Sequence, residues 1–449
     1  MTSRFSFISH RSAHSSLPGS IAYDDPLDEY GEDETYKYLP LAALPIAIDL
    51  EEDVIDILNV LPSDLAESII DLVADKNTLI ACTLVCRAWV PRSRKHLMDM
   101  SIVRINRVKA DAFVELCDSP SFSLRKIPHL ELSFRGESSR MAEAVVPRLA
   151  KRRVEVEALH LEADSISSGS CGKALSLLSS TYRGRVTELS VKNYLSDPLR
   201  DVLPFVHSFG KLQMFRLVGR FNGRASAKRL PAKLERFTFM NESGSSRGTE
   251  QVLHWLSSPK DGVPSPLLEL TIQGLAITDM QELQKVLDFV GRNLRCLTLT
   301  SISLGDRGEH FASFLLRHPL TGGLDYPSDL IPDLQKLHSL RYISITPHLH
   351  RHQTQTRESH ALQLVMKILM SISSEFLEEV VLSIAHIPLA EFHELDFRSL
   401  DEAFNDPSTL LRVKKLTIKC HSTGILLLRE WISRCQERNI VDFVAVSSI

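Results

Sequence analysis

In two places of this sequence, cysteine or histidine side chains occur close enough together to be examined as candidate reactive or metal-binding groups. Cys82 and Cys86 lie four residues apart in an apolar stretch, and buried thiols of this kind behave as small apolar residues. His348, His350 and His352 alternate in a polar segment, and imidazoles can bind a metal ion. No carboxylate or thiolate stands beside them at a usual ligand spacing, so we expect a flexible loop and no metal there.

The sequence also lacks the common signatures of enzymes. It has no phosphate-binding P-loop, no G-x-G-x-x-G turn and no H-E-x-x-H helix. We therefore expect a protein without catalytic activity and without a cofactor. An enzyme in the C-terminal region remains an alternative, which a deep pocket with convergent ionisable groups would favour.

Composition places the chain among ordinary soluble globular proteins. It has 449 residues, of which 43% are hydrophobic and 24% are charged, and its formal net charge is -4. That balance favours neither nucleic acid nor a membrane as partner, and no apolar run is long enough for a transmembrane helix. Seven scattered cysteines favour a reducing compartment, the cytoplasm and/or the nucleus.

The first part of the chain has the composition of a disordered tail. Residues 1–20 are rich in Ser and contain Arg but no acid, a composition that overlaps with mitochondrial presequences. Residues 24–34 then become densely acidic, which favours disorder. We expect a disordered tail over residues 1–50.

The segment from Leu61 to Trp89 holds more apolar residues than short helices can bury on their own. Pro62 suits the first turn of a helix, and the apolar residues that follow have helical spacing. We expect a second helix, capped by Asn77 or Thr78.

This second helix carries an apolar stripe, and we expect Pro91 to end the segment. The stripe can pack on the rest of the same chain, as the apolar face of an amphipathic helix commonly does. It consists of Leu79, Cys82, Val85, Cys86 and Trp89.

The order of residues here resembles the F-box. The resemblance covers residues 58–98 and is closest to the large fungal F-box families, in which a leucine-rich C-terminal region follows. The junction at 75–77 departs from the family, many of whose members have a Pro-containing turn there. The matching residues are Leu61-Pro62, Asp64-Leu65, Ile69-Ile70 and Val85-Cys86-Arg87-Ala88-Trp89.

The resemblance implies a partner rather than an activity. F-box domains bind a Skp-family adaptor, which links them to a cullin–RING ubiquitin ligase. Such interfaces bury on the order of 1,200–2,000 Å² in total, and apolar anchors near their centre dominate the affinity. The adaptor is therefore expected to cover the surplus apolar face. The family's contact positions correspond here to Leu61, Pro62, Leu65, Ile69, Val85, Cys86 and Trp89.

A pattern of the form apolar-x-x-apolar-x-apolar recurs along the rest of the chain. Its starts lie 22 to 46 residues apart, in or above the range of leucine-rich repeats. LMDMSI at 97–102 fits as a first copy. The other copies are IPHLEL at 127–132, VEALHL at 156–161, VTELSV at 186–191, LQMFRL at 212–217, LERFTF at 234–239, LLELTI at 267–272, LRCLTL at 294–299, LRYISI at 340–345, LEEVVL at 377–382, VKKLTI at 413–418 and VDFVAV at 441–446.

The alternating end of each copy has the period of a β-strand, and helix-like segments lie between the copies. Repeated strand-then-helix order predicts parallel strands with helices on one side, stacked as a solenoid. Thr278 or Asp279 is expected to cap one helix. The expected helices are 140–152, 196–209, 248–257, 279–290, 306–317, 357–373 and 424–437.

The predicted fold is therefore α/β. It consists of the tail, a small all-α F-box over 58–98, and an irregular leucine-rich-repeat-like β/α solenoid over 99–449. The Asn expected after each strand of a leucine-rich repeat is missing from the two closest copies, where Ile302 and Leu275 stand. An unrelated α/β domain with a conventional sheet is the alternative.

Polar residues that alternate with the core positions are expected to line the concave face of the solenoid, because residues two apart in a strand share a face. Their alternating charges favour a protein or peptide ligand, for which we single out Arg216, Arg236, Tyr342 and Lys415. The full row is His129, Glu131, His160, Glu162, Glu188, Lys192, Arg216, Arg236, Glu269, Gln273, Tyr342, Glu379, Lys415 and Lys419.

A denser basic patch lies within this row. It can bind an acidic or phosphorylated peptide, since Arg pairs with carboxylate and phosphate through two hydrogen bonds. A solvated loop is the plainer interpretation. The patch comprises Arg216, Arg220, Arg224, Lys228, Arg229 and Arg236.

Taken together, these features predict a substrate receptor of a Skp–cullin–F-box ubiquitin ligase, with an unknown target protein. Two alternatives from another class remain: an F-box protein that uses the adaptor outside ubiquitination, and a non-catalytic repeat scaffold. Co-purification of a cullin distinguishes them.

Overall fold

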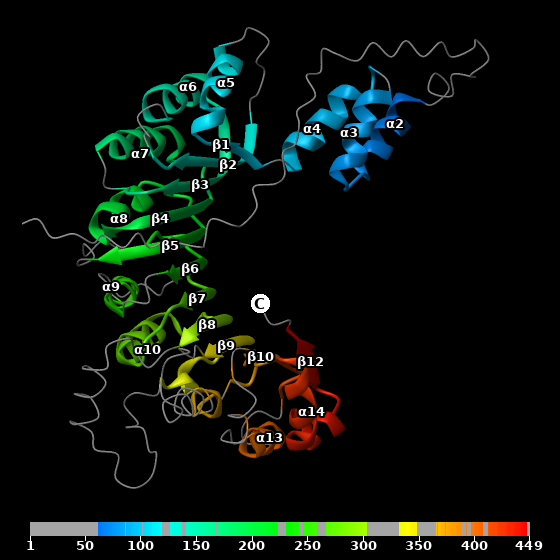
Figure 1. Cartoon of the computed structure of the whole chain (residues 1–449), viewed down its shortest axis with the longest axis vertical. Helices are drawn as coiled ribbons and strands as arrows, with labels where there is room; N and C mark the ends of the chain where they lie inside the picture. The colour runs from blue at the N-terminus through cyan, green and yellow to red at the C-terminus, as the bar shows by residue number, and fades with distance from the viewer. Residues whose placement is uncertain are drawn as a thin grey trace, which may run out of the picture. The chain divides into compact units, whose positions relative to one another are not determined.

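The computed structural model has two parts, a helical segment and a β/α array, which span most of the chain from Pro62 onward (Figure 1). The expected tail over 1–50 lies outside the described residues. These are 62–85, 87–100, 102–118, 126–136, 141–166, 169–222, 230–242, 246–257, 266–302, 332–347, 365, 367–372, 374–385, 387, 392, 397–406 and 412–446.

The helical segment has three helices: α2 (Ser63–Asp71), α3 (Lys76–Val85) and α4 (Val90–Met100). Pro62 directly precedes α2, as expected. The expected cap of α3 was wrong: Asp75 Oδ2 accepts from the backbone N–H of Thr78 at 2.7 Å and from its hydroxyl at 2.8 Å. Asp75 satisfies the first turn because it lies at the N-terminal end of α3, where a short acceptor reaches these donors.

Pro91 does not end the segment, contrary to the prediction. It lies in the first turn of α4, a position where a proline's missing N–H leaves no hydrogen bond unmade. The apolar stripe predicted for a single helix does not lie on one helix, because α3 ends at Val85. Leu79 and Cys82 are buried and Val85 is exposed, while Trp89 is half-buried in the turn before α4.

The array contains a parallel sheet of twelve strands, described in sequence order from β1 to β12. Every pair of neighbours in the chain is also a hydrogen-bonded pair in the sheet, which is the arrangement of a solenoid. The strands are β1 (Ile102–Ile105), β2 (Lys126–Phe134), β3 (Glu155–Ala163), β4 (Glu188–Pro198), β5 (Met214–Asn222), β6 (Arg236–Asn241), β7 (Glu269–Gln273), β8 (Cys296–Ile302), β9 (Tyr342–Pro347), β10 (Glu379–Ser383), β11 (Lys415–Cys420) and β12 (Val441–Ala445).

The recurring apolar pattern explains these strands. In every copy from 127–132 to 413–418, all three apolar positions are buried, and together they form one continuous core. The predicted recurrence of parallel strands is confirmed. The first copy is only partly right, because α4 runs to Met100 and β1 begins at Ile102.

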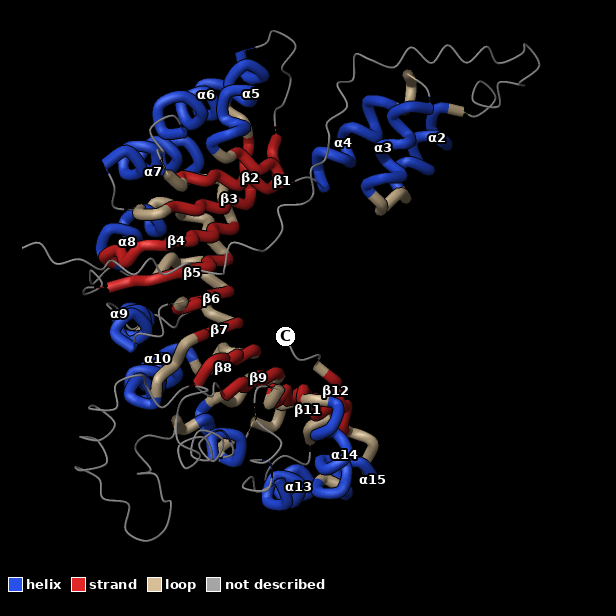
Figure 2. The backbone as a smooth tube through the Cα atoms, in the orientation of Figure 1, coloured by secondary structure: helices blue, strands red, loops and turns tan. Residues whose placement is uncertain are grey.

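Helices connect the strands, and α5 to α10 line one side of β1 to β8 (Figure 2). Of the predicted segments, 140–152, 196–209, 248–257, 279–290 and 424–437 contain helices, whereas 306–317 and most of 357–373 lie outside the described residues. The helices are α5 (Arg107–Asp118), η1 (Met141–Val145, a π-helix), α6 (Val146–Arg152), α7 (Gly169–Tyr182), α8 (Leu199–His207), α9 (Ser246–Leu256), η2 (Ile277–Asp279), α10 (Met280–Val290), η4 (Leu334–Lys336), α13 (Phe397–Asn405), α14 (Ser422–Trp431) and α15 (Ser433–Glu437).

Asp279 precedes α10 but does not cap it through its side chain. Its Oδ2 accepts instead from the N–H of Ala276 at 2.9 Å and closes the turn that enters the helix. The capping prediction was therefore right about the position and wrong about the bond.

Asparagine and glycine alternate just beyond the core positions of the middle strands. Asn193 lies beside Gly219, and Gly219 lies beside Asn241. The φ of Gly219 is +125°, and a Cβ there would lie 1.9 Å from the carbonyl oxygen of Asn193, so only glycine fits. Asn241 donates to the hydroxyl of Thr249 on α9 at 3.0 Å. These buried amides tie the strand ends to each other and to the helices.

Candidate functional site

The helical segment leaves apolar side chains in water. Among the residues expected to bind an adaptor, Pro62 is exposed, and Leu65, Ile69 and Val85 are exposed by 54%, 47% and 46%. Trp89 is half-buried. Leu61 of this set lies outside the described residues, as does Cys86.

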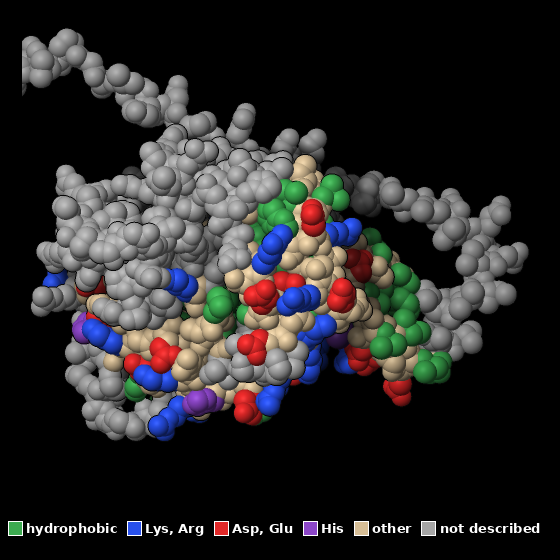
Figure 3. Space-filling view, turned by 90° about the horizontal axis from the view of Figure 1, so that it is seen from below, with side chains coloured by type: hydrophobic (Ala, Val, Ile, Leu, Met, Phe, Trp, Pro, Cys, Tyr) green, Lys and Arg blue, Asp and Glu red, His purple; other side chains and the backbone are tan. Residues whose placement is uncertain are grey.

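Three further apolar residues of this segment, which the sequence places in the same helices, are also exposed. Leu72 is exposed by 85%, Leu84 by 77% and Ile80 by 43%. Figure 3 shows hydrophobic side chains gathered on the surface of these helices. The apolar face of α2 and α3 is defined here as Leu65, Ile69, Leu72, Ile80, Leu84 and Val85.

A polar network holds this face in place. Arg92 on α4 donates through Nε to Asp71 on α2 at 2.6 Å, and His96 lies 2.6 Å from the same carboxylate. These two hydrogen bonds hold the pKa of Asp71 well below its usual range. Arg92 also approaches Glu67 at 3.7 Å. Charged side chains therefore link α2 to α4, whereas the apolar side chains of α2 and α3 that define the face stay exposed.

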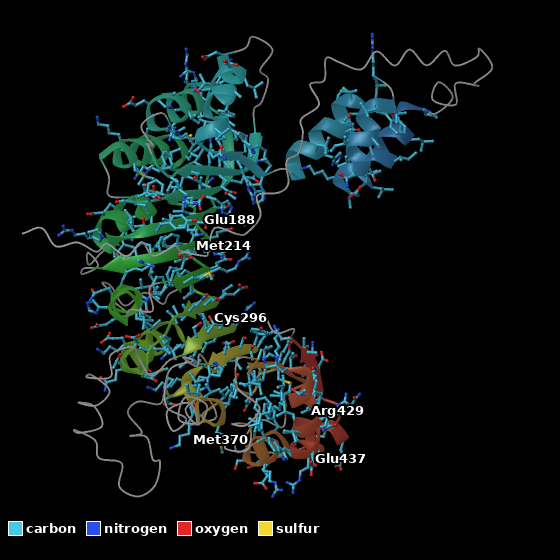
Figure 4. The ribbon with its side chains drawn as sticks, in the orientation of Figure 1. Glu188, Met214, Cys296, Met370, Arg429 and Glu437 are labelled. Atoms are coloured by element: carbon cyan, nitrogen blue, oxygen red, sulfur yellow. The ribbon has the colours of Figure 1, made fainter. Side chains whose placement is uncertain are left out.

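The strands of the array present a second surface, on the side away from the helices, which we call the open face. Figure 4 shows Glu188, Met214 and Cys296 along it. Register places the open-face residues in rows across the strands. The central row runs Arg104, Glu131, His160, Ser190, Arg216, Thr238, Thr271, Thr298 and Ser344.

The four residues expected to bind a target lie on this face but not at one place. Arg216 is in the central row on β5, and Arg236 lies on the neighbouring strand β6. Tyr342 is on β9 and Lys415 on β11, where Lys415 lies 3.6 Å from Glu379 and 3.8 Å from Asp442. The structure thus brings together the two arginines and separates the other two. Arg224, Lys228 and Arg229 of the basic patch lie outside the described residues.

A hollow of about 320 Å³ lies on the open face over β2 to β6, and we call it the charged pocket. It contains Arg216 together with ionisable residues from four other strands or strand ends. Its lining residues are Glu131, His160, Leu161, Glu162, Ser190, Lys192, Arg216, Val218, Met240 and Glu242.

Two of its acids have partners within the chain. Arg104 Nε donates to Glu131 at 2.7 Å. The hydroxyl of Tyr194 donates to Glu162, and burial together with this bond raises the pKa of Tyr194. Arg104 therefore balances the charge of Glu131, whereas Glu162 is hydrogen-bonded but keeps its negative charge.

The two cations of the pocket are placed differently. Arg216 contacts the sulfur of Met240 at 3.2 Å, a weak acceptor, and forms no ion pair with a carboxylate among the described residues. Lys192 lies 4.7 Å from the ring centre of Tyr194, and a hydrogen bond to that residue raises the pKa of Lys192. Both side chains can donate hydrogen bonds to an anion.

Glu131, His160 and Ser190 stand side by side in the central row and have the residue types of a catalytic triad. No hydrogen bond joins His160 to either neighbour in the structure, and Glu131 bonds to Arg104 instead. Burial lowers the pKa of His160, which is therefore neutral at pH 7. The bonds by which a triad activates its serine are not formed here.

Comparison with known proteins adds no relative. No protein-family model matches the sequence, and the search of curated proteins finds no match.

The cysteine and histidine groups named from the sequence do not form a site among the described residues. Cys82 is buried, as expected, while His348, His350 and His352 lie outside the described residues. Among the residues that the structure describes, no three His, Cys, Asp or Glu side chains are grouped to hold a metal ion. In the same ranges, no helix has the length and hydropathy to cross a membrane.

Two features of these surfaces were not predicted from the sequence. Register alone brings Glu131, Glu162 and Lys192 to one pocket. The Asn–Gly alternation was visible as the eighth residue of consecutive copies: Asn193, Gly219, Asn241 and Gly274.

Proposed function

We propose that this protein is a substrate receptor of a Skp–cullin–F-box ubiquitin ligase. The proposal takes the helical segment as an F-box and the β/α array as an irregular leucine-rich-repeat-like domain. The observation that carries it is the exposed apolar face of α2 and α3, which coincides with the F-box positions Leu65, Ile69 and Val85.

Such a face is costly in water. Burying one large aliphatic side chain is worth about 1.5–3 kcal/mol, so six exposed apolar residues on two short helices favour a covering partner strongly. The flanking helix α4 is held by Arg92 and Asp71 without using this face. A partner can therefore dock on it without rearranging the segment.

In this proposal the two parts divide the work. The F-box binds the Skp-family adaptor, and through it the cullin–RING ligase. The open face of the array holds the target protein, which raises the effective concentration of its lysines near the ubiquitin-loaded enzyme. The chain itself performs no chemistry, takes no cofactor, and acts in the cytoplasm or nucleus, where these ligases work.

Affinity purification of the tagged full chain from a eukaryotic host tests the proposal. The test variant is Leu65→Asp with Ile69→Asp, which places two charges in the apolar face. The matched control is Leu426→Asp on α14, which places a charge at a residue exposed by 72% elsewhere.

We expect a Skp-family adaptor and a cullin with the parent and with the control, and neither with the double variant. An adaptor without a cullin would instead indicate an F-box protein that acts outside ubiquitination. The absence of both from a folded parent would exclude the receptor and favour a repeat scaffold.

A further inference from the structure

The charged pocket contains a pair of cations suited to an anionic group. Lys192 on β4 and Arg216 on β5 lie on adjacent strands and line the same hollow. Side chains on neighbouring strands at diagonal positions lie about 7–8 Å apart at their Cα atoms, within reach of one shared ligand. Neither forms an ion pair with a described carboxylate.

The remaining charges limit what that anion can be. Glu131 is paired with Arg104, whereas Glu162 accepts from the uncharged Tyr194 and keeps its negative charge near Lys192. Glu242 is exposed at the pocket, forms no ion pair with a described cation, and adds a negative charge beside Lys192. A single carboxylate is therefore better matched than a doubly charged phosphoryl group, because the second charge would be repelled by Glu242.

The part of the central row that follows the pocket carries no charge, with Arg236 and Glu269 in the row beside it. Thr238, Thr271 and Thr298 continue the central row beyond Arg216, on β6, β7 and β8. We call these three residues the threonine lane. Neighbouring strands lie about 4.8 Å apart, so the lane extends about 14 Å from Arg216. An extended peptide covers that distance in about four residues. Short hydroxyl side chains can donate to and accept from its backbone without requiring a charge.

We propose that the open face binds an extended segment of the target with one carboxylate side chain, held by Lys192 and Arg216. About four uncharged residues on one side of that carboxylate cross the threonine lane. This inference rests on the proposed function, since it names the class of target segment that the receptor recognises. The ligand is an acidic but unphosphorylated peptide.

Short peptide libraries with blocked termini test this inference on the immobilised full chain. The libraries share random flanking positions, and their fixed central residue is Glu, Gln, Lys or phosphoserine. Retention is compared for the parent, Arg216→Gln, Lys192→Gln and the control Arg292→Gln, whose exposed cation lies in the turn after α10. Thermal unfolding of each variant shows whether it is folded.

We expect the parent and the control to retain the Glu library about tenfold better than the Gln library, as one charge-assisted site predicts. Each pocket variant should lose most of that preference, and retained peptides should lack charged residues on one side of Glu. Equal retention of Glu and Gln, stronger retention of phosphoserine, no retention at all, or an unchanged preference in both pocket variants would overturn the inference. Adaptor binding by the same preparations is a separate measurement, so failure of the receptor proposal is distinguishable.

Discussion

The helical segment and the β/α array differ in how far their apolar residues are buried. In the array, the three apolar positions of each copy from 127–132 to 413–418 are buried in one core. Leu72, which directly follows α2, and Leu84 on α3 are exposed by 85% and 77%. In a repeat array each unit is covered by its neighbour. In our proposal, the exposed residues of the helical segment are instead the ones that a partner covers.

Truncating a core residue of the array should have the largest effect on stability. Phe239 on β6 is fully buried, with its ring 6.2 Å from that of Phe221. Phe239→Ala removes these contacts and leaves a cavity, so we expect the free energy of unfolding to fall by about 3–5 kcal/mol. Denaturant unfolding followed by circular dichroism measures it. A loss below about 1 kcal/mol would mean that the core is not continuous at this strand.

A methyl group at Gly219 should cost nearly as much. Its φ is +125°, and the added Cβ would collide with the carbonyl of Asn193. We expect Gly219→Ala to destabilise the array by about 2–4 kcal/mol. The control is Gly210→Ala, where nothing lies within 4 Å of the added Cβ. Equal stability of the two variants would contradict the tight Asn–Gly packing between β4 and β5.

The stability of the array should also depend on pH, because of Asp279. Burial raises the pKa of Asp279 from 3.8 to about 7, helped by the charges of Glu250 and Glu282. The folded state therefore holds this proton more tightly than the unfolded state. The corresponding stability is complete below about pH 4 and is lost as the pH rises toward 7.

Asp279→Asn should remove that dependence, since the amide oxygen still accepts from Ala276 and carries no charge. We expect the variant to be more stable than the parent by about 4 kcal/mol at pH 8, with little difference at pH 4. Unfolding curves at both pH values measure this. A variant that is less stable at pH 8 would show that the ionised carboxylate is favourable in the fold.

The smallest effect is expected at the apolar face of the helical segment. Leu72→Ser and Leu84→Ser alter side chains that already lie in water, so the free energy of unfolding should change by no more than about 0.5 kcal/mol. The same measurement as for Phe239→Ala applies. A loss comparable to that of the core variant would mean that the chain itself covers this face, and the comparison between the two regions would fail.

The sequence predicted the strands well because each copy repeats three buried positions at fixed spacing. It predicted the helices less completely: α5, α7 and α13 were not expected. The sequence of α7 is rich in Ser and Gly, and its helix depends on packing of residues such as Leu178 and Tyr182 against the core. Tertiary packing of this kind overrides a weak helix propensity. A single sequence does not show such packing.

The candidate sites were predicted in part for a similar reason. Which residues face away from the core follows from strand period, so Arg216 and Arg236 were placed correctly on one face. Which residues meet at one point depends on register between strands. The ion pair of Arg104 with Glu131, and the approach of Lys192 to Tyr194, have no signal in the sequence.

The most direct test of the central claim is hydrogen–deuterium exchange of the full chain with and without a purified Skp-family adaptor. We predict that adaptor slows exchange in α2 and α3, with the strands of the array unchanged, and that Leu65→Asp with Ile69→Asp abolishes the protection. Exchange that is unaffected by a saturating concentration of adaptor, or protection confined to the array, would contradict the account.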